Sequence, residues 1–250
     1  MKVAILGAAG RMGHMLCDLV DRSEELELVA KCDIREDYPR TWPSGTEAVI
    51  DFTFHEAVPS NIAKAAEEGV VYVLGTTGLT DEEQKAVDAA AEKIPVVQSG
   101  NYSLGINLLL GLVAKASEIL GLEYDCEVVE MHHRNKKDSP SGTALMLAKA
   151  AAEGRNQDFG EVSVFGREGM VGERPQGEIA VHAVRGGSVI GDHTVMFAGD
   201  VERVEITHKA QTREAFAAGA LRAALWAAGK KPGIRDTFPS TNRRERMTAP

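Results

Sequence analysis

The first hundred residues alternate between short apolar runs and segments with helical periodicity. Five of the runs are typical of buried strands: KVAILG, LELVAKCD, AVIDFTF, VVYVLG and IPVVQS. Strands that alternate with helices in this way form βαβ units and a parallel sheet. The helix after Leu79 has a marked start, because Thr80 and Glu83 have the spacing of a capping box. The pattern predicts an α/β fold with a Rossmann-like parallel sheet over residues 1–103.

A different pattern follows. NYSLGINLLLGLVAKASEIL predicts a long apolar helix, YDCEVVEM a strand and TALMLAKAAAE another helix, before four strand-like runs: EVSVFG, EIAVHAV, HTVMFAG and RVEITHKA. The last of these alternates Val204, Ile206 and His208 with polar residues, which predicts a sheet with one covered face. We expect a second, α+β domain with a mixed sheet over residues 104–212. The sequence alone does not place the final helix, TREAFAAGALRAALWAAG, and the polar tail PSTNRRERMTAP is expected to be mobile.

Composition excludes several classes. A chain of 250 residues with 44% hydrophobic content can bury a sizeable core. Its net charge of -9 argues against a nucleic-acid partner, which would require a basic surface. No apolar run is expected to approach the roughly 18 residues of a membrane span, so we expect a cytoplasmic protein with no membrane partner. Cys17, Cys32 and Cys126 lack a CxxC spacing, which favours buried, reduced thiols over metal ligands or nucleophiles.

A glycine-rich turn follows the first apolar run. Its glycines, Gly7, Gly10 and Gly13, are spaced by three, whereas the dinucleotide fingerprint would place glycines at residues 7, 9 and 12. The physical requirement is still met, because small residues let a pyrophosphate approach the backbone at a helix start. Asp33 lies where an acidic group accepts hydrogen bonds from the adenosine ribose and favours NAD, while Arg35 is able to pair with a 2′-phosphate. NADH and NADPH therefore both stay open.

Two further loops follow apolar strands. They are Gly75, Thr76 and Thr77 after the fourth run, and Gly100, Asn101, Tyr102 and Ser103 after the fifth. In an open parallel sheet, ligands bind beyond the carboxyl ends of the strands. The small and hydroxyl residues suit a nicotinamide and its ribose, and the alternative is that both segments are only turns.

Residues 130–143, EMHHRNKKDSPSGT, gather proton donors, cations and free amides in one loop. Adjacent His132 and His133 point in opposite directions in an extended segment, so one is able to donate a proton while the other binds a carboxylate. A metal site is disfavoured, because no ligand pair has the i, i+4 spacing. Lys136 and Lys137 taken alone are typical of a solvated charge pair. The helix start that follows, at Ser141, Gly142 and Thr143, argues against this, because its free amides together with a lysine suit a small dianion.

These stretches closely resemble the 4-hydroxy-tetrahydrodipicolinate reductase family, also called dihydrodipicolinate reductases. The resemblance rests on VAILGAAGRMG, VIDFT, GTTG, GNYSLGIN, EMHHRNKKDSPSGTA, VRGGSVIGDHTVMFAG and ITHKAQTREAFAAGALRAALW, and it extends to about Phe238. It implies NAD(P)H-dependent reduction of a small cyclic dicarboxylate in lysine and diaminopimelate biosynthesis. It also implies a homotetramer built through the strand-rich domain, with a C-terminal helix (within residues 213–250) that returns to the nucleotide domain.

The resemblance further implies roles for individual residues. His132 corresponds to the family's proton donor and Lys136 to its second catalytic residue, while the substrate-binding group is His133, Ser141, Gly142 and Thr143. The implied cofactor-binding residues are Gly7, Ala8, Ala9, Gly10, Arg11, Met12, Asp33, Gly75, Thr76, Thr77, Gly100, Asn101, Tyr102 and Ser103. Some members carry arginine directly after the acidic residue, where this chain has Ile34, so the cofactor preference stays open.

Two rival functions are less well supported. A semialdehyde dehydrogenase requires an activated cysteine, and all three cysteines are expected to be buried. A nucleotide-sensing regulator would require a basic DNA-binding helix, and a chain with net charge -9 offers no obvious one.

Overall fold

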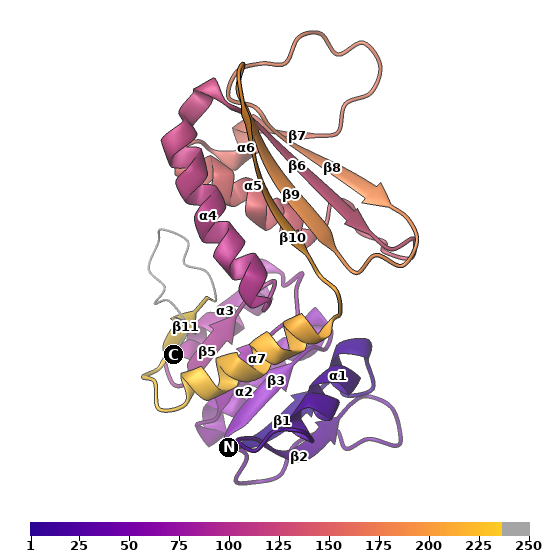
Figure 1. Ribbon diagram of the computed structural model, residues 1–250. Coiled ribbons are helices and arrows are strands. Elements are labelled where there is room, and N and C mark those ends of the chain that lie inside the picture. The colour runs from indigo at the N-terminus through magenta and orange to yellow at the C-terminus, as the bar shows by residue number, and fades with distance from the viewer. Residues whose placement is uncertain (237–250) are drawn as a thin grey trace. The chain divides into compact units, whose positions relative to one another are not determined.

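The computed structural model describes residues 1–236 and divides into two compact units. The first comprises Met1–Leu104 together with the chain from Arg213 onward, and the second comprises Gly105–Thr212. Figure 1 shows a sheet with flanking helices in each unit. The polar tail for which mobility was expected, residues 239–250, lies outside the described residues.

The first unit is built on a six-stranded parallel sheet, as expected for a Rossmann-like domain. Its strand order is β11-β5-β4-β3-β1-β2, and every neighbouring pair is parallel. Five strands correspond to the five apolar runs: β1 (Lys2–Leu6), β2 (Glu27–Cys32), β3 (Ala48–Asp51), β4 (Val71–Leu74) and β5 (Pro95–Gln98). The sixth, β11 (Gly233–Arg235), was not predicted, because a three-residue strand carries no detectable periodicity.

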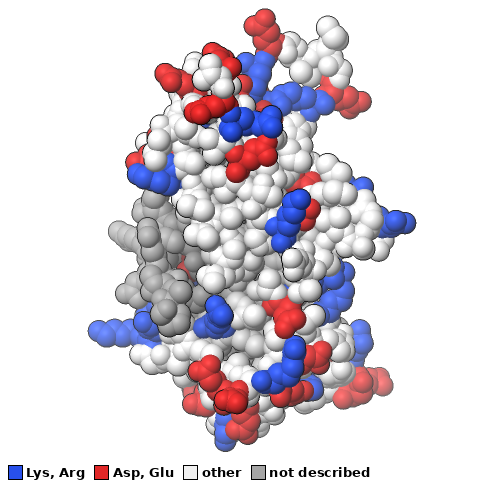
Figure 2. Space-filling model, in the orientation of Figure 1, with Lys and Arg blue, Asp and Glu red and all other residues white. Residues whose placement is uncertain are grey.

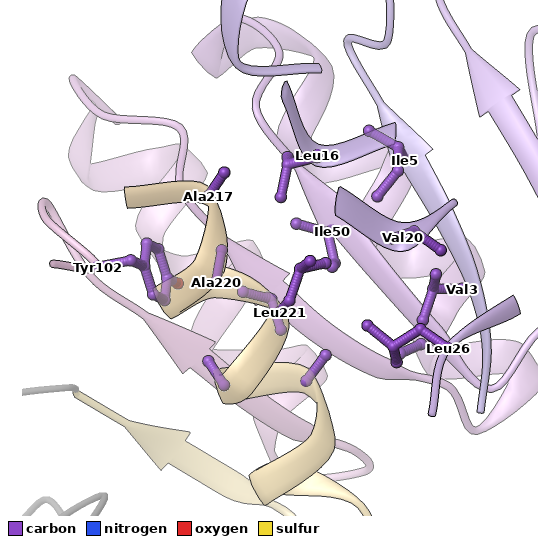
Figure 3. Close-up of a cluster of buried hydrophobic side chains, with 14 of the residues drawn as sticks. Val3, Ile5, Leu16, Val20, Leu26, Ile50, Tyr102, Ala217, Ala220 and Leu221 are labelled. Carbon is purple, nitrogen blue, oxygen red and sulfur yellow. The ribbon is translucent and has the colours of Figure 1, made fainter. Parts of the chain in front are cut away.

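Helices cover both faces of this sheet. On one face, Val3, Ile5 and Ile50 pack with α1 (Arg11–Val20) and α7 (Glu214–Ala227) in the core drawn in Figure 3. The alternate strand residues pack on the other face with α2 (Val58–Glu68), which follows the 3-10 turn η1 (His55–Ala57), and with α3 (Asp81–Ala91). The capping box predicted at Thr80 and Glu83 is confirmed at the start of α3.

The second unit contains a five-stranded mixed sheet, which confirms the predicted fold class. Strand β6 (Asp125–His132) lies at its centre, parallel to β8 (Ile179–Arg185) and antiparallel to β9 (Asp192–Ala198). The outer strands are β7 (Ser163–Phe165) and β10 (Arg203–Lys209). Helix α5 (Gly142–Gly154) packs on β6, β8 and β9.

The run EVSVFG is only partly a strand. Asp158 caps a short helix, α6 (Phe159–Val162), by accepting hydrogen bonds from the amides of Gly160 and Glu161. Strand β7 therefore begins only at Ser163. Glu161 and Val162, which the run assigned to the strand, belong instead to the capped helix.

Strand β10 differs from its prediction. Val204 is exposed and Ile206 and His208 are only half-buried, so the expected covered face is absent in this single chain. The reason is position: β10 is an edge strand paired with β9 alone, and α5 packs on β6, β8 and β9.

Helix α4 (Leu104–Leu120), extended by the 3-10 turn η2 (Gly121–Glu123), corrects a second expectation. The segment Leu104–Glu123 is long and apolar enough to cross a membrane by length and composition, because few charges interrupt it. One such helix is weak evidence for a span. Within the second unit, α4 packs on α5: Ser117 Oγ donates to Ala151 O at 2.7 Å, and Gly154 leaves room for the backbone of Ala114.

Charged side chains are mixed by sign on the face drawn in Figure 2, where no large area of a single sign is visible.

A dense ionic network anchors the loop between β7 and β8. The Glu127 carboxylate on β6 accepts hydrogen bonds from Arg167 at 2.9 and 3.0 Å and from Arg174 at 2.9 Å. It also lies 2.7 Å from His182 Nε2. Burial raises the pKa of Glu127, but these hydrogen bonds outweigh burial and hold the pKa at about 2.

We expect Glu127→Gln to destabilise the protein in a pH-dependent manner. Because the folded pKa is depressed from about 4.5 to about 2, the ionised carboxylate stabilises the fold above pH 4.5, and this stabilisation is lost as the pH falls towards 2. Denaturant unfolding at a series of pH values should show a deficit of about 2–3 kcal/mol at pH 7 that shrinks below pH 4.5. A deficit that does not change with pH would contradict the assignment.

Candidate active site

The glycine-rich turn joins β1 to α1. Gly7 has a left-handed backbone with φ of +78°, and its amide donates to Cys32 O at 2.9 Å. A Cβ at Gly13 would lie 2.2 Å from Gly7 O, so only glycine lets the helix approach the strand this closely. Gly10, the N-cap of α1, has no side chain to occupy the first-turn amides. The turn therefore fits a nucleotide pyrophosphate bound at the helix start.

Asp33 lies against this turn, although 24 residues separate it from Ala9. Its Oδ2 accepts a hydrogen bond from Ala9 N at 3.0 Å, and its Oδ1 accepts one from Arg35 N at 3.2 Å. The following residue, Ile34, is 72% exposed. The expected acidic group is thus beside the glycine-rich turn.

The loop after β4 is held by a buried carboxylate. Asp51, at the end of β3, is completely buried and accepts hydrogen bonds from Thr76 Oγ1 at 3.0 Å, Thr53 N at 2.9 Å and Asn61 Nδ2 at 2.9 Å. Its Oδ2, which binds Asn61, also accepts a hydrogen bond from the Tyr72 hydroxyl. The side chain of Thr76 therefore fixes the loop, and Thr77 is the exposed hydroxyl.

The loop after β5 is held in a similar way. The Tyr102 hydroxyl lies 2.8 Å from both Leu74 O and Val97 O, and the side chain of Asn101 accepts a hydrogen bond from Ser103 N at 2.9 Å. These three residues are buried, whereas Gly100 is exposed. Of the residues expected at the nicotinamide, Thr77 and Gly100 are exposed and Gly75 is half-buried, whereas the other four are buried.

His132 ends strand β6 in the second unit. The buried face of this strand carries Cys126, Val128, Glu130 and His132, and His133 on the opposite side is half-buried. The two histidines therefore differ in environment, as their adjacency predicts. His132 Nδ1 lies 2.6 Å from Glu130 Oε2. A Cβ at Gly191 would lie 2.9 Å from His132 Nε2, so glycine leaves space beside that nitrogen.

The lysine loop connects β6 to α5. Lys136 Nζ lies 2.9 Å from Asp138 Oδ2, and its side chain is 20% exposed. Ser141 is the N-cap of α5 and is turned inward: its Oγ accepts from Ala144 N at 3.2 Å and lies 3.1 Å from His193 Nε2. Gly142 at the helix start is exposed, so an anion has access to that end of α5.

Glu130 connects these elements. It is fully buried and is bound in bidentate fashion by Arg185 at 2.8 and 2.9 Å and by Ser141 N at 2.9 Å. Burial raises its pKa, but hydrogen bonds from Arg185, His132 and Ser141 hold the pKa below its usual range. Burial lowers the pKa of His132, with Glu130 opposing, and burial lowers the pKa of His193 to about 3.

Glu130, Arg185, Gly191 and His193 were not predicted as site residues. One signal was present for Glu130, because strand alternation assigns it to the same buried face as Cys126 and Val128. A charged residue in a buried register requires a partner. That the partner is Arg185, 55 residues away, depends on the parallel pairing of β6 with β8 and is not visible in the sequence.

The cysteines provide no nucleophile. All three are buried and free, and burial raises the pKa of the Cys32 and Cys126 thiols to about 11 and about 12. Structural thiols were expected, and their burial is confirmed. Within residues 1–236, no group of three or more His, Cys, Asp or Glu side chains is arranged to hold a metal ion.

Known protein families account for both units. The N-terminal dihydrodipicolinate reductase family model matches residues 1–102, and the C-terminal model of the same enzyme matches residues 105–238. The chain belongs to the dihydrodipicolinate reductase family. The N-terminal domain of this family binds a nucleotide, and its enzymes are NAD(P)H-dependent oxidoreductases.

Individual relatives agree. The 4-hydroxy-tetrahydrodipicolinate reductase of Halorhodospira halophila is 41% identical over 257 residues, covering 94% of this chain and 96% of the relative. That of Caulobacter vibrioides is 45% identical over 244 residues, covering 94% and 95%. Among solved structures, a dipicolinate-bound dihydrodipicolinate reductase from Paenisporosarcina sp. TG-14 shares the fold with a TM-score of 0.74 at 24% identity, covering 94% of this chain and 97% of that one.

We expect Gly13→Ala to weaken nucleotide binding. The added Cβ would press on Gly7 O and Ala8 and displace the turn whose amides bind the pyrophosphate. Calorimetric titration with NADH or NADPH should show a raised Kd, and the free energy of unfolding should fall by about 1–3 kcal/mol, as for other overpacked sites.

Gly154→Ala is the matched control. Its Cβ would also lie 2.2 Å from a backbone oxygen, that of Ala114, but in the second unit. It should lower stability and leave the nucleotide Kd unchanged. Equal losses of affinity in both variants would show that the effect is general destabilisation.

Proposed function

We propose that this protein reduces 4-hydroxy-tetrahydrodipicolinate to tetrahydrodipicolinate with NADH or NADPH, in the cytoplasm, as a step of lysine and diaminopimelate biosynthesis. One observation carries the proposal: a carboxylate-bound His132 shares a loop with Lys136 and an open helix start, in a chain 41–45% identical to reductases of that name. Hydride chemistry belongs to the nicotinamide, so the protein has to bind, orient and protonate.

The first unit supplies the nucleotide site. Residues 7–12 hold the pyrophosphate at the start of α1, and Asp33 binds the adenosine ribose. The loops at residues 75–77 and 100–103 bind the nicotinamide half, with Thr77 and Gly100 accessible at their surfaces. The proposal is supported by the position of all four segments at the carboxyl ends of parallel strands.

The second unit supplies the substrate site. His133, Gly142 and Thr143 bind a carboxylate of the cyclic substrate, helped by the dipole of α5. Ser141 contributes indirectly as the N-cap that fixes the helix start. Loss of the 4-hydroxyl of the substrate as water leaves an unsaturated ring. His132 then delivers a proton to the carbon next to the one that accepts the hydride, and Lys136 stabilises the negative charge that accumulates there.

The direct test is the loss of nicotinamide absorbance in a coupled assay. Substrate is generated in situ from pyruvate and aspartate semialdehyde by the upstream synthase, with NADH and NADPH in parallel reactions. Oxidation that depends on the synthase is expected, and the two rates rank the cofactors. No oxidation with either cofactor would refute the proposed function.

Lys136→Ala is expected to lower kcat by about 100-fold, the scale for removing one group that stabilises transition-state charge. The fold should be unaffected, because the Lys136 ion pair is with the exposed Asp138. Lys137→Ala, which removes an exposed lysine from the neighbouring position, is the control and should retain nearly full activity. The measurement is the steady-state kcat of both variants, and near-normal turnover in Lys136→Ala would refute the proposed catalytic role of Lys136.

The proposal includes a homotetramer built through the second unit. Helix α5 packs on one face of this sheet, while Val129, Met131 and Met196 on the other face are half-buried in the single chain. A second copy would cover this face. Light scattering should give the mass of four 26.8 kDa chains, and a monomer at assay concentrations would contradict this part of the proposal.

A further inference from the structure

The buried carboxylate of Glu130 bonds to two parts of the proposed substrate site at once. Its Oε2 lies 2.6 Å from His132 Nδ1, and its Oε1 accepts the hydrogen bond from Ser141 N at 2.9 Å. We infer that Glu130 is a positioning residue that fixes both the orientation of the proton donor and the helix start that receives the substrate carboxylate. This inference rests on the proposed function.

The contact defines which nitrogen of His132 carries the transferable proton. An ionised carboxylate only accepts hydrogen bonds, so Nδ1 carries the hydrogen that points to Glu130. Nε2 is then the nitrogen that gains and loses a proton. The absence of a side chain at Gly191 keeps the space beside Nε2 open, since a Cβ there would lie 2.9 Å away.

Arg185 keeps Glu130 in its ionised form and in place. Its two terminal nitrogens bind the two carboxylate oxygens at 2.8 and 2.9 Å, and Nη2 also donates to Asp138 O at 2.7 Å. Since Glu130 is completely buried, its side chain has little freedom to leave this arrangement. The carboxylate is therefore a rigid support for the imidazole ring.

The charges around His132 act in opposite directions. Glu130 favours the protonated ring, whereas burial and the positive charges of Lys136 and Arg185 disfavour it. His193 on β9 contacts the ring edge-on with centroids 5.1 Å apart. His208 on β10 acts electrostatically on His193, and Asp192 acts on His208. Removing the Glu130 charge should therefore lower the pKa of His132 further. A proton donor with a lower pKa loses its proton at a lower pH, so activity should also be lost at a lower pH.

The alternative is that Glu130 only stabilises the fold as the partner of Arg185. Strand β6 contains a control for this alternative. Glu127 lies three residues earlier on the opposite face and is held by two arginines and His182, whereas Glu130 is held by one arginine, His132 and the Ser141 amide. Glu127→Gln removes the same charge from the same strand and a similar network.

The test compares kcat, KM and the pH profile of Glu130→Gln and Glu127→Gln in the full-length protein, at equal oligomeric mass. Glu130→Gln is expected to lower kcat by about 100-fold, the lower end of the contribution of a positioned acid. The alkaline limb of its pH–activity profile should move to lower pH, and its KM for the nucleotide should not change. Glu127→Gln should lower the melting temperature yet keep kcat within about twofold and the limb in place.

Two kinetic results would overturn the inference. One is that Glu130→Gln keeps the kcat and the alkaline pH limit of the wild-type enzyme. The other is that Glu130→Gln and Glu127→Gln lose kcat equally. An inactive wild-type enzyme would instead refute the proposed function, so the two failures are distinguishable.

A second measurement does not depend on activity or on the folding of a variant. The nitrogen chemical shifts of His132 in ¹⁵N-histidine-labelled wild-type protein report which ring nitrogen is protonated in the neutral form. The inference requires a hydrogen on Nδ1. A neutral His132 with its hydrogen on Nε2 would overturn it.

Discussion

The arrangement of the second unit depends on one buried carboxylate and its ion pair with Arg185. Glu130 is completely buried, and a carboxylate in that position is unstable unless its oxygens are fully hydrogen-bonded. Arg185, His132 and the amide of Ser141 provide four donors, from β8, from β6 itself and from the start of α5. The need to satisfy one charge thus holds β6, the start of α5 and the distant strand β8 together, and the loop that carries Lys136 is closed between β6 and α5.

The first unit uses the same solution. Asp51 is also completely buried at the end of a strand, and its donors come from the loops after β3 and β4, from α2 and from the Tyr72 hydroxyl. Burial and the adjacent Asp51 charge raise the pKa of Tyr72 well above its usual range, so its hydroxyl stays a donor. In both units a saturated carboxylate makes functional loops rigid without occupying the surface on which a ligand binds.

Local patterns in the sequence predicted what depends on local structure. The alternation of apolar runs with helical segments identified five strands of the parallel sheet. The Thr80 capping box marked the start of α3, and Asp33, at the end of the second strand, contacts the glycine-rich turn. Features that depend on how distant strands pair were not visible in the sequence. Strand β11 exists only because β5 has a free edge, and Glu130 finds Arg185 only through the register of β6 with β8. The alternation in β10 correctly marked a strand, but whether its apolar side is covered depends on neighbouring elements.

An acidic chain that binds a dianion has to provide local positive charge, and the described contacts indicate how it does so. Arg185, whose side chain is 20% exposed, is paired with the buried Glu130, so its charge is largely offset within the protein. Lys136, whose side chain is 20% exposed, pairs with Asp138, whose side chain is 63% exposed, so water screens this pair at the Asp138 side and the pair contributes little to stability. Exchanging Asp138 for a substrate carboxylate therefore costs little. Since the Arg185 charge is offset by Glu130, the proposed function requires that attraction for the dianion come from Lys136, the helix start at Gly142 and the protonated form of His132. The strength of binding should accordingly follow the protonation of that histidine.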